Sequence, residues 1–144
     1  MPSARASIRI AAAPVHVRSV VTDFARYPEI LPEMRVATVL RAAPGDWTVA
    51  FTLDLVRPVS YTLRLWQEEQ GDGAVVVRWS LVEGNLFRAN EGSWTLRPLP
   101  DGATEATYEV LVQLALFVPK PLMSGLAGTN LPKMLEAFKI RAER

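Results

Sequence analysis

More than half of the chain alternates apolar and polar residues with a period of two, from residue 34 to about residue 116. This alternation is typical of β-strands that bury one face and expose the other. The clearest runs are residues 47–55, 61–65, 75–81, 87–96 and 104–116. A chain with this pattern needs a second layer to cover the apolar face of its sheet.

Short turn signals separate the alternating runs. Examples are Pro44-Gly45-Asp46, the GDG at 71–73 and the PDG at 100–102. Consecutive strands joined by such short turns favour antiparallel pairing, because parallel strands need long crossover connections. The sequence therefore predicts an antiparallel meander.

Both ends of the chain follow other periods. Residues 6–10 predict a first strand, and Pro14 occupies a position suited to the first turn of a helix. The buried face of this helix is expected to consist of Val17, Val20, Val21 and Phe24. Residues 118–144 return to helical spacing, with a break or kink expected near Pro132. The expected class is α+β: a curved antiparallel sheet of about seven strands wrapped around a long C-terminal helix, in the order β-α-β(6)-α.

Composition excludes several function classes. The 144 residues fit a single domain spanning 1–144. The absence of cysteine excludes a thiolate metal site or cysteine nucleophile, and a single histidine, His16, argues against a zinc site, so neither metal nor cofactor is expected. The net charge of +1 argues against nucleic-acid binding. No segment reaches the roughly 20 apolar residues of a membrane span, so a cytoplasmic protein is expected, with transient membrane contact left open.

Several short motifs carry a family resemblance. They are TDF at 22–24, YP at 27–28, LP at 31–32, NEGSWTL at 90–96, VPK at 118–120 and FKIRAE at 138–143. Together they resemble the START-like (SRPBCC) superfamily, and within it the coenzyme-Q-binding and polyketide cyclase/dehydrase branch. The resemblance implies a helix-grip fold with a deep hydrophobic cavity. Members of the superfamily bind ubiquinone or other lipids, guide polyketide cyclisation or associate with ribosomes.

Candidate ligand-binding residues lie mainly on the predicted inner face. A strongly curved sheet that grips one helix encloses more space than medium-sized side chains fill, so large inner residues are expected to line a cavity. Simple packing of the same residues in a core is the alternative. The residues expected in the ligand site are Tyr27, Leu31, Met34, Phe51, Tyr61, Leu63, Trp79, Trp94, Tyr108, Val110, Met123, Leu126 and Met134.

The tryptophans give a separate expectation about orientation. Trp47, Trp79 and Trp94 fall on inward positions, whereas Trp66 falls on an outward one. The corner at 27–32 and the kink at 125–132 are expected to gate the cavity. Glu33, beside the first of these segments, is expected in solvent.

Three functions follow from these expectations. The preferred one is binding, transport or chaperoning of a hydrophobic small molecule such as a quinone, isoprenoid or lipid. An enzyme of the polyketide cyclase/dehydratase type is the alternative, with Tyr61 or Tyr108 as proton donor. A ribosome-associated interaction protein is the third, for which Arg35, Arg41 and Arg57 would form a local basic patch. The oligomeric state is left open.

Overall fold

The computed structural model describes residues 3–54, 57–115 and 131–144. Its elements follow one another along the chain in the predicted order, a strand, short helices, six strands and a C-terminal helix. They are β1 (Ser3–Ile10), α1 (Pro14–Val21), the 3-10 turn η1 (Phe24–Arg26), α2 (Tyr27–Ile30), β2 (Met34–Ala43), β3 (Asp46–Asp54), β4 (Pro58–Glu69), β5 (Val75–Gly84), β6 (Phe87–Pro98), β7 (Thr104–Leu114) and α4 (Leu131–Ala142).

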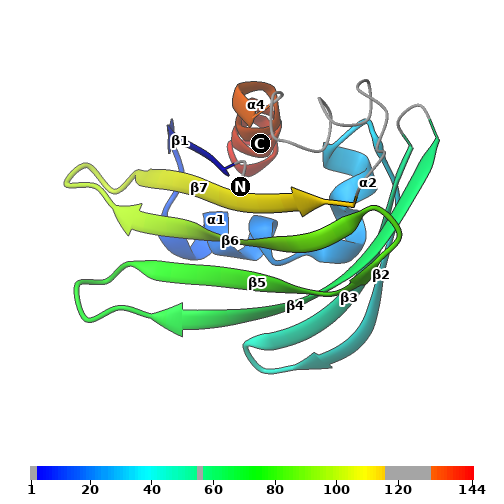
Figure 1. Ribbon diagram of the computed structural model, residues 1–144. Coiled ribbons are helices and arrows are strands. Elements are labelled where there is room, and N and C mark those ends of the chain that lie inside the picture. Colours follow the sequence, from blue (N-terminus) through cyan, green and yellow to red (C-terminus); the bar gives the residue numbers. More distant parts are fainter. Residues whose placement is uncertain (1–2, 55–56, 116–130) are drawn as a thin grey trace.

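The strands form one seven-stranded antiparallel sheet in the order β1-β7-β6-β5-β4-β3-β2. Figure 1 shows that this sheet is strongly bent and that the helices lie along one side of it. Gly45, Gly73 and Gly102 have positive φ angles at the hairpin turns, a conformation that glycine adopts without steric cost. The predicted helix-grip architecture and antiparallel meander are confirmed.

One element boundary differs from the sequence prediction. β1 begins at Ser3 rather than residue 6, because its whole length pairs with β7, from Ser3 opposite Leu111 to Ile10 opposite Thr104. The C-terminal helix α4 is described from Leu131 to Ala142. The rest of the predicted helix, including the glycines at 125 and 128, lies outside the described residues.

The core forms where the inner face of the sheet meets the helices. Ile10, Val17, Leu96, Leu135 and Phe138 are among its fully buried members, and together they join β1, α1, β6 and α4. Burying a large aliphatic or aromatic side chain contributes about 1.5–3 kcal/mol. The bent sheet and its covering helices are therefore stabilised by one continuous apolar layer.

The orientation predicted for the tryptophans is confirmed. Trp79 and Trp94 are buried on the inner face, and Trp47 packs edge-on against Phe24 with ring centroids 5.3 Å apart. Trp66 instead lies on the outer face, where the Arg64 guanidinium lies 5.0 Å from its ring centroid. The period of two thus distinguishes the inner from the outer face of the sheet.

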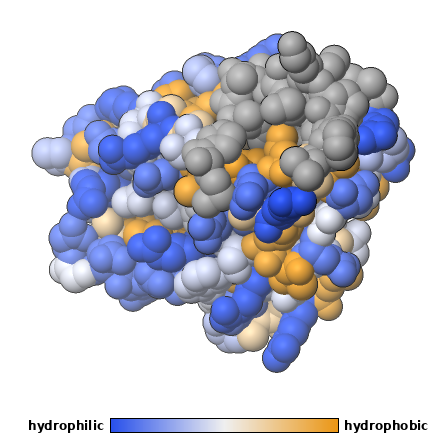
Figure 2. Space-filling view, viewed as in Figure 1, coloured by the Kyte–Doolittle hydropathy of each residue, from blue (hydrophilic) through white to orange (hydrophobic). Residues whose placement is uncertain are grey.

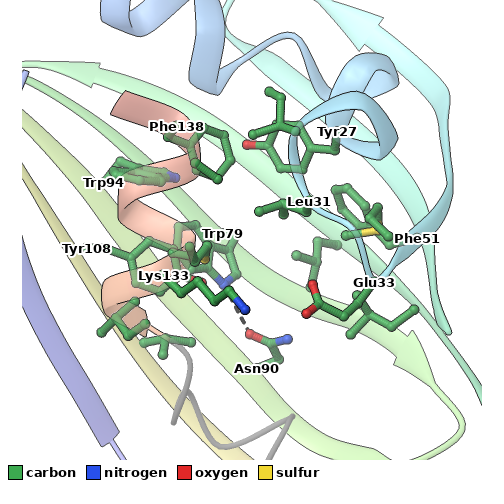
Figure 3. A pocket seen from close by; sticks show the side chains of 18 of the residues that line it. Tyr27, Leu31, Glu33, Phe51, Trp79, Asn90, Trp94, Tyr108, Lys133 and Phe138 are labelled. Carbon is green, nitrogen blue, oxygen red and sulfur yellow. Dashed lines mark hydrogen bonds between the residues drawn. The ribbon is translucent and has the colours of Figure 1, made fainter. Parts of the chain in front are cut away.

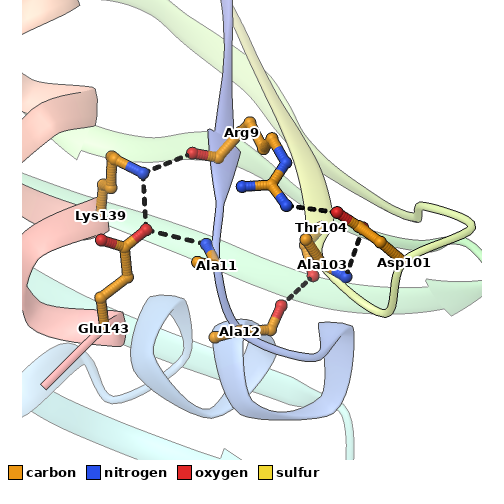
Figure 4. Close-up of polar contacts among 8 residues, drawn as sticks. All are labelled: Arg9, Ala11, Ala12, Asp101, Ala103, Thr104, Lys139 and Glu143. Atoms are coloured by element: carbon orange, nitrogen blue, oxygen red, sulfur yellow. Dashed lines mark hydrogen bonds and ion pairs between the residues drawn. The ribbon is translucent and has the colours of Figure 1, made fainter.

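One edge of the sheet is fastened to the C-terminal helix. The Lys139 ammonium donates to the carbonyl of Arg9, and the Glu143 carboxylate accepts from the backbone N–H of Ala11, each over 2.8 Å (Figure 4). Thr104 adds a hydrogen bond from its hydroxyl to the carbonyl of Ala12, also 2.8 Å long. These contacts occupy backbone groups at and just beyond the end of the edge strand β1.

The opposite edge, β2, carries no such cover among the described residues. Val36, Val39 and Leu40 are exposed there, and register shifts interrupt its pairing with β3. Figure 2 shows apolar surface on the side of the molecule where β2 and β3 lie. Irregular pairing of this kind discourages an edge strand from adding further strands.

Within the described ranges, no helix combines the length and apolar character needed to cross a lipid bilayer.

Candidate ligand-binding site

A cavity of about 510 Å³ lies between the inner face of the sheet, α2 with the loop after it, and α4. Its wall is mainly aromatic and aliphatic, with a few polar groups (Figure 3). This combination is typical of sites for hydrophobic small molecules, in which apolar area provides affinity and a few polar groups fix orientation.

The structure brings most of the predicted ligand-site residues into this wall. Those in the lining are Tyr27, Leu31, Met34, Phe51, Tyr61, Leu63, Trp79, Trp94, Tyr108, Val110 and Met134. Met123 and Leu126 lie outside the described residues. The inner face therefore surrounds empty volume, although a ligand-binding role for each of these side chains stays a prediction.

Aromatic rings form one connected network around the cavity, joined through Tyr27 and Phe138. In one part of it, Tyr61 stacks on Phe51 at 5.4 Å and meets Phe87 edge-on at 5.2 Å. In another part, Tyr108 contacts Trp79 at 5.2 Å and Trp94 at 5.0 Å between ring centroids. Offset and edge-to-face pairs hold one another in place, because the positive edge of one ring meets the negative face of the next. The lining is therefore preorganised.

Tyr27 anchors the corner that forms one side of the cavity. Its hydroxyl donates a hydrogen bond of 2.5 Å to the carbonyl of Val21, and its ring packs edge-on against Phe138 of α4. Burial raises the pKa of the Tyr27 phenol well above its ordinary value. The corner also reaches α4 through Glu29, which accepts from Arg141 over 3.1 Å. This hydrogen bond is the main reason that the pKa of Glu29 is lowered.

Tyr61 and Tyr108 present phenols toward the cavity. Among the described residues, neither hydroxyl has a hydrogen-bond partner, and burial raises the pKa of both groups well above the ordinary value of a tyrosine. Both are therefore neutral at physiological pH and can donate a hydrogen bond to a ligand. Their raised pKa values make them weaker proton donors than an ordinary phenol.

Sequence reasoning missed the other polar residues of the wall: Glu33, Asn90, Lys133 and Glu136. The expectation that Glu33 lies in solvent was wrong, because its side chain is half-buried and lines the cavity. Asn90 shares the inward parity of Trp94 on β6, a signal that the period of two did contain. Lys133 and Glu136 reach the cavity only through the way α4 docks on the sheet.

Strands β5 and β6 stop pairing near Asn90. Pairing of β5 with β6 runs from Val75 opposite Leu96 to Trp79 opposite Gly92, and it ends there although both strands continue. The Trp79 indole lies at this point, and its N–H donates to the Asn90 side-chain oxygen over 3.1 Å. A side chain at Gly92 would meet the Glu109 carbonyl at 2.2 Å and the Trp79 ring at 2.6 Å. Position 92 of β6 therefore requires glycine, because the Trp79 ring and the Glu109 carbonyl leave no room for a side chain.

Residues considered for other chemistry do not join the cavity. His16 is exposed on α1 and is absent from the lining. Across the parts of the chain that are described, no three His, Asp or Glu side chains cluster in a way that could hold a metal ion. Arg35, Arg41 and Arg57, the residues of the predicted basic patch, are exposed.

Comparison with known proteins places these features in a family. Residues 10–139 match the family model described as polyketide cyclase / dehydrase and lipid transport. No curated protein matches the chain in sequence.

Solved structures of similar fold come from bacteria and from human. A STAR-related lipid transfer protein from Xanthomonas axonopodis has a TM-score of 0.84 at 21% identity, covering 99% of this chain and 86% of that one. The Zhui aromatase/cyclase from Streptomyces sp. R1128 has a TM-score of 0.81 at 16% identity, covering 99% and 93%. Human StAR-related lipid transfer protein 5 has a TM-score of 0.75 at 11% identity, covering 98% and 73%. At these identities the similarity establishes the fold.

Proposed function

Because the chain belongs to the polyketide cyclase/dehydrase and lipid transport family, within the START-like superfamily, we propose that it binds a hydrophobic small molecule in its cavity and carries it unchanged. The observation that carries this proposal is the aromatic cavity of about 510 Å³. Burial of apolar ligand surface contributes about 25 cal/mol per Å² before ordering costs. A quinone, an isoprenoid or a fatty-acyl lipid has the apolar surface that such a wall can cover.

The character of the phenols favours carriage over catalysis. Tyr61 and Tyr108 are the phenols that the cyclase alternative would use as proton donors, and burial raises their pKa values. General acid catalysis is most effective when the pKa of the acid lies near the working pH. A neutral phenol that donates a hydrogen bond serves recognition without giving up its proton.

Binding can be tested with decylubiquinone and with palmitate, followed by native mass spectrometry and tryptophan fluorescence. Trp79 and Trp94 line the cavity, so a bound quinone should quench their emission. Filling the cavity with Ala137→Phe should weaken binding at least about tenfold, because Ala137 is part of the wall. The matched control Ala42→Phe adds the same ring at an exposed site and should leave binding unchanged. A clean unliganded mass together with no quenching would contradict the proposal.

A cyclase or dehydratase is the second candidate, supported by two phenols that face the cavity without a partner among the described residues. It predicts that Tyr61→Phe or Tyr108→Phe abolishes conversion of a linear poly-β-ketone thioester and leaves its binding intact. Carriage predicts no conversion by the unmodified protein.

Association with ribosomes stays a prediction. It would require Arg35, Arg41 and Arg57 to act together, and its signature would be co-sedimentation with ribosomes that weakens steeply as salt rises.

A further inference from the structure

We infer that Asn90 recognises an uncharged carbonyl oxygen of the ligand, and that Trp79 positions the Asn90 amide for this contact. The inference rests on the proposed binding function and adds the polar chemistry of the ligand to it.

Asn90 is a buried polar residue in an apolar wall. Its side chain lies on the inner face of β6, only 8% of the residue is exposed, and it lines the cavity. Figure 3 shows its amide near Trp79, with their hydrogen bond drawn. Buried amides need hydrogen-bond partners, because an unpaired polar group in an apolar environment is costly.

The partner of Asn90 determines which end of its amide faces the ligand. An indole N–H can only donate, so the Trp79 N–H must meet the side-chain oxygen of Asn90 rather than its nitrogen. The oxygen end is therefore occupied and the NH₂ end remains. None of the described residues accepts a hydrogen bond from that NH₂ group, and the cavity lies beside it. The site thus offers a donor and requires an acceptor oxygen from the ligand.

The position of this donor is fixed in advance. Trp79 is held by the ring of Tyr108, whose centroid is 5.2 Å from its own, and by close contact with Gly92. An indole held in this way keeps the amide from rotating by 180°, which would set the Asn90 NH₂ against the indole N–H. A preorganised donor loses little entropy when the ligand binds.

The charges of the wall favour an uncharged acceptor. Among the described residues, its acidic and basic side chains are Glu33, Glu136 and Lys133. In this part of the wall, one cation against two carboxylates leaves no positive excess for a ligand carboxylate, whose burial without a matching cation would be costly. A ketone or quinone carbonyl accepts from Asn90 without that cost.

Three probes with one aromatic body test the inference: 2-acetylphenanthrene, 2-isopropenylphenanthrene and phenanthrene-2-carboxylate. The first two have the same shape and differ only in an oxygen that replaces a CH₂ group. Dissociation constants measured by fluorescence titration should favour the ketone over the alkene by about tenfold, the value of one well-placed neutral hydrogen bond. The carboxylate should bind more weakly than the ketone.

Two variants test whether the preference for the ketone over the alkene depends on Asn90 and Trp79. Asn90→Leu should bring the ketone-to-alkene ratio close to one while alkene binding persists, which also shows that the cavity remains folded. Trp79→Phe frees the amide to rotate and should reduce the ratio several-fold. The control Asn85→Leu, at an exposed asparagine between β5 and β6, should leave the ratio unchanged. In NMR spectra, the side-chain amide protons of Asn90 should shift with the ketone and far less with the alkene.

The failures of the two proposals are distinguishable. Equal affinity for ketone and alkene, or a ratio unchanged in Asn90→Leu, overturns the role of Asn90 and leaves hydrophobic binding intact. Tighter binding of the carboxylate than of the ketone overturns the uncharged acceptor. If none of the three probes binds and the tests with decylubiquinone and palmitate are also negative, the proposed function is overturned as well.

Discussion

The indole ring of Trp79 lies against Gly92 of the neighbouring strand, so closely that a Cβ atom at position 92 would stand 2.6 Å from it. The same atom would stand 2.2 Å from the Glu109 carbonyl of β7. Neither group can easily move away from such an atom, since one is a backbone carbonyl and the other is a buried ring. This contact fixes the position of a ring that lines the cavity.

Gly92→Ala should therefore destabilise the protein by about 3 kcal/mol, the upper range for forced overpacking. Chemical denaturation gives the free energy of unfolding that checks this value. The control is Gly71→Ala, because a Cβ at Gly71 would meet nothing within 4 Å. Equal free energies of unfolding for the two variants would show that the structure accommodates a Cβ atom at position 92 and would contradict this prediction.

Tyr27→Phe should lower the free energy of unfolding by about 1 kcal/mol, because it leaves the Val21 carbonyl without its hydrogen bond from the phenol. Tyr61→Phe is the matched control, since the Tyr61 hydroxyl has no partner among the described residues. Its effect on unfolding should be clearly smaller. A larger loss in the control than in Tyr27→Phe would contradict the anchoring role of the corner.

All three tyrosines should resist ionisation until the protein unfolds. Burial raises the pKa values of Tyr27, Tyr61 and Tyr108 above the unfolded value of about 10. The folded chain thus keeps these protons where the unfolded chain loses them, and stability is full below pH 10 and falls as pH rises above it. Tyrosinate absorbance at 295 nm should rise together with loss of circular dichroism. Absorbance that rises near pH 10 in a folded protein would contradict this prediction.

The fastening of β1 should weaken in acid through Glu143. Its pKa is lowered, mainly by the hydrogen bond from Lys139 and then by the Ala11 N–H. Because the folded pKa lies below the unfolded one, this contribution to stability is present above the unfolded pKa and is lost as pH falls through the folded pKa. Amide exchange in β1, after correction for intrinsic rates, should become faster in that range.

Glu143→Gln should remove most of this acid dependence, whereas Glu91→Gln, an exposed site on β6, should retain it. Exchange in β1 that is independent of pH in the unmodified protein would show that other contacts hold the edge.

The period of two predicted the inner face of the sheet because each strand buries one side. It identified Phe51, Trp79 and Tyr108 as inward residues without any knowledge of the fold. It could not predict whether that face was filled, because alternation specifies direction and not volume. The cavity follows from the bend of the sheet and the docking of α4, which depend on contacts between distant segments.

The polar groups of the wall were missed for different reasons. Asn90 has the correct parity, yet an isolated asparagine in a strand does not by itself reveal a cavity-facing amide. The orientation of the Asn90 amide depends on Trp79, which lies eleven residues earlier on another strand and donates a hydrogen bond to it. Lys133 and Glu33 face the cavity from elements that meet only in the folded chain.

The two edges of the sheet differ in how firmly they are held. On one side, α4 is hydrogen-bonded to the backbone around the end of β1, while on the other β2 is irregularly paired and its valines and Leu40 are exposed. A sheet that is restrained at one edge changes its curvature more easily at the opposite edge. Adjustment of the cavity to ligands of different size is therefore expected to begin at the β2 edge, whereas the Trp79–Asn90 pair serves as a fixed reference point.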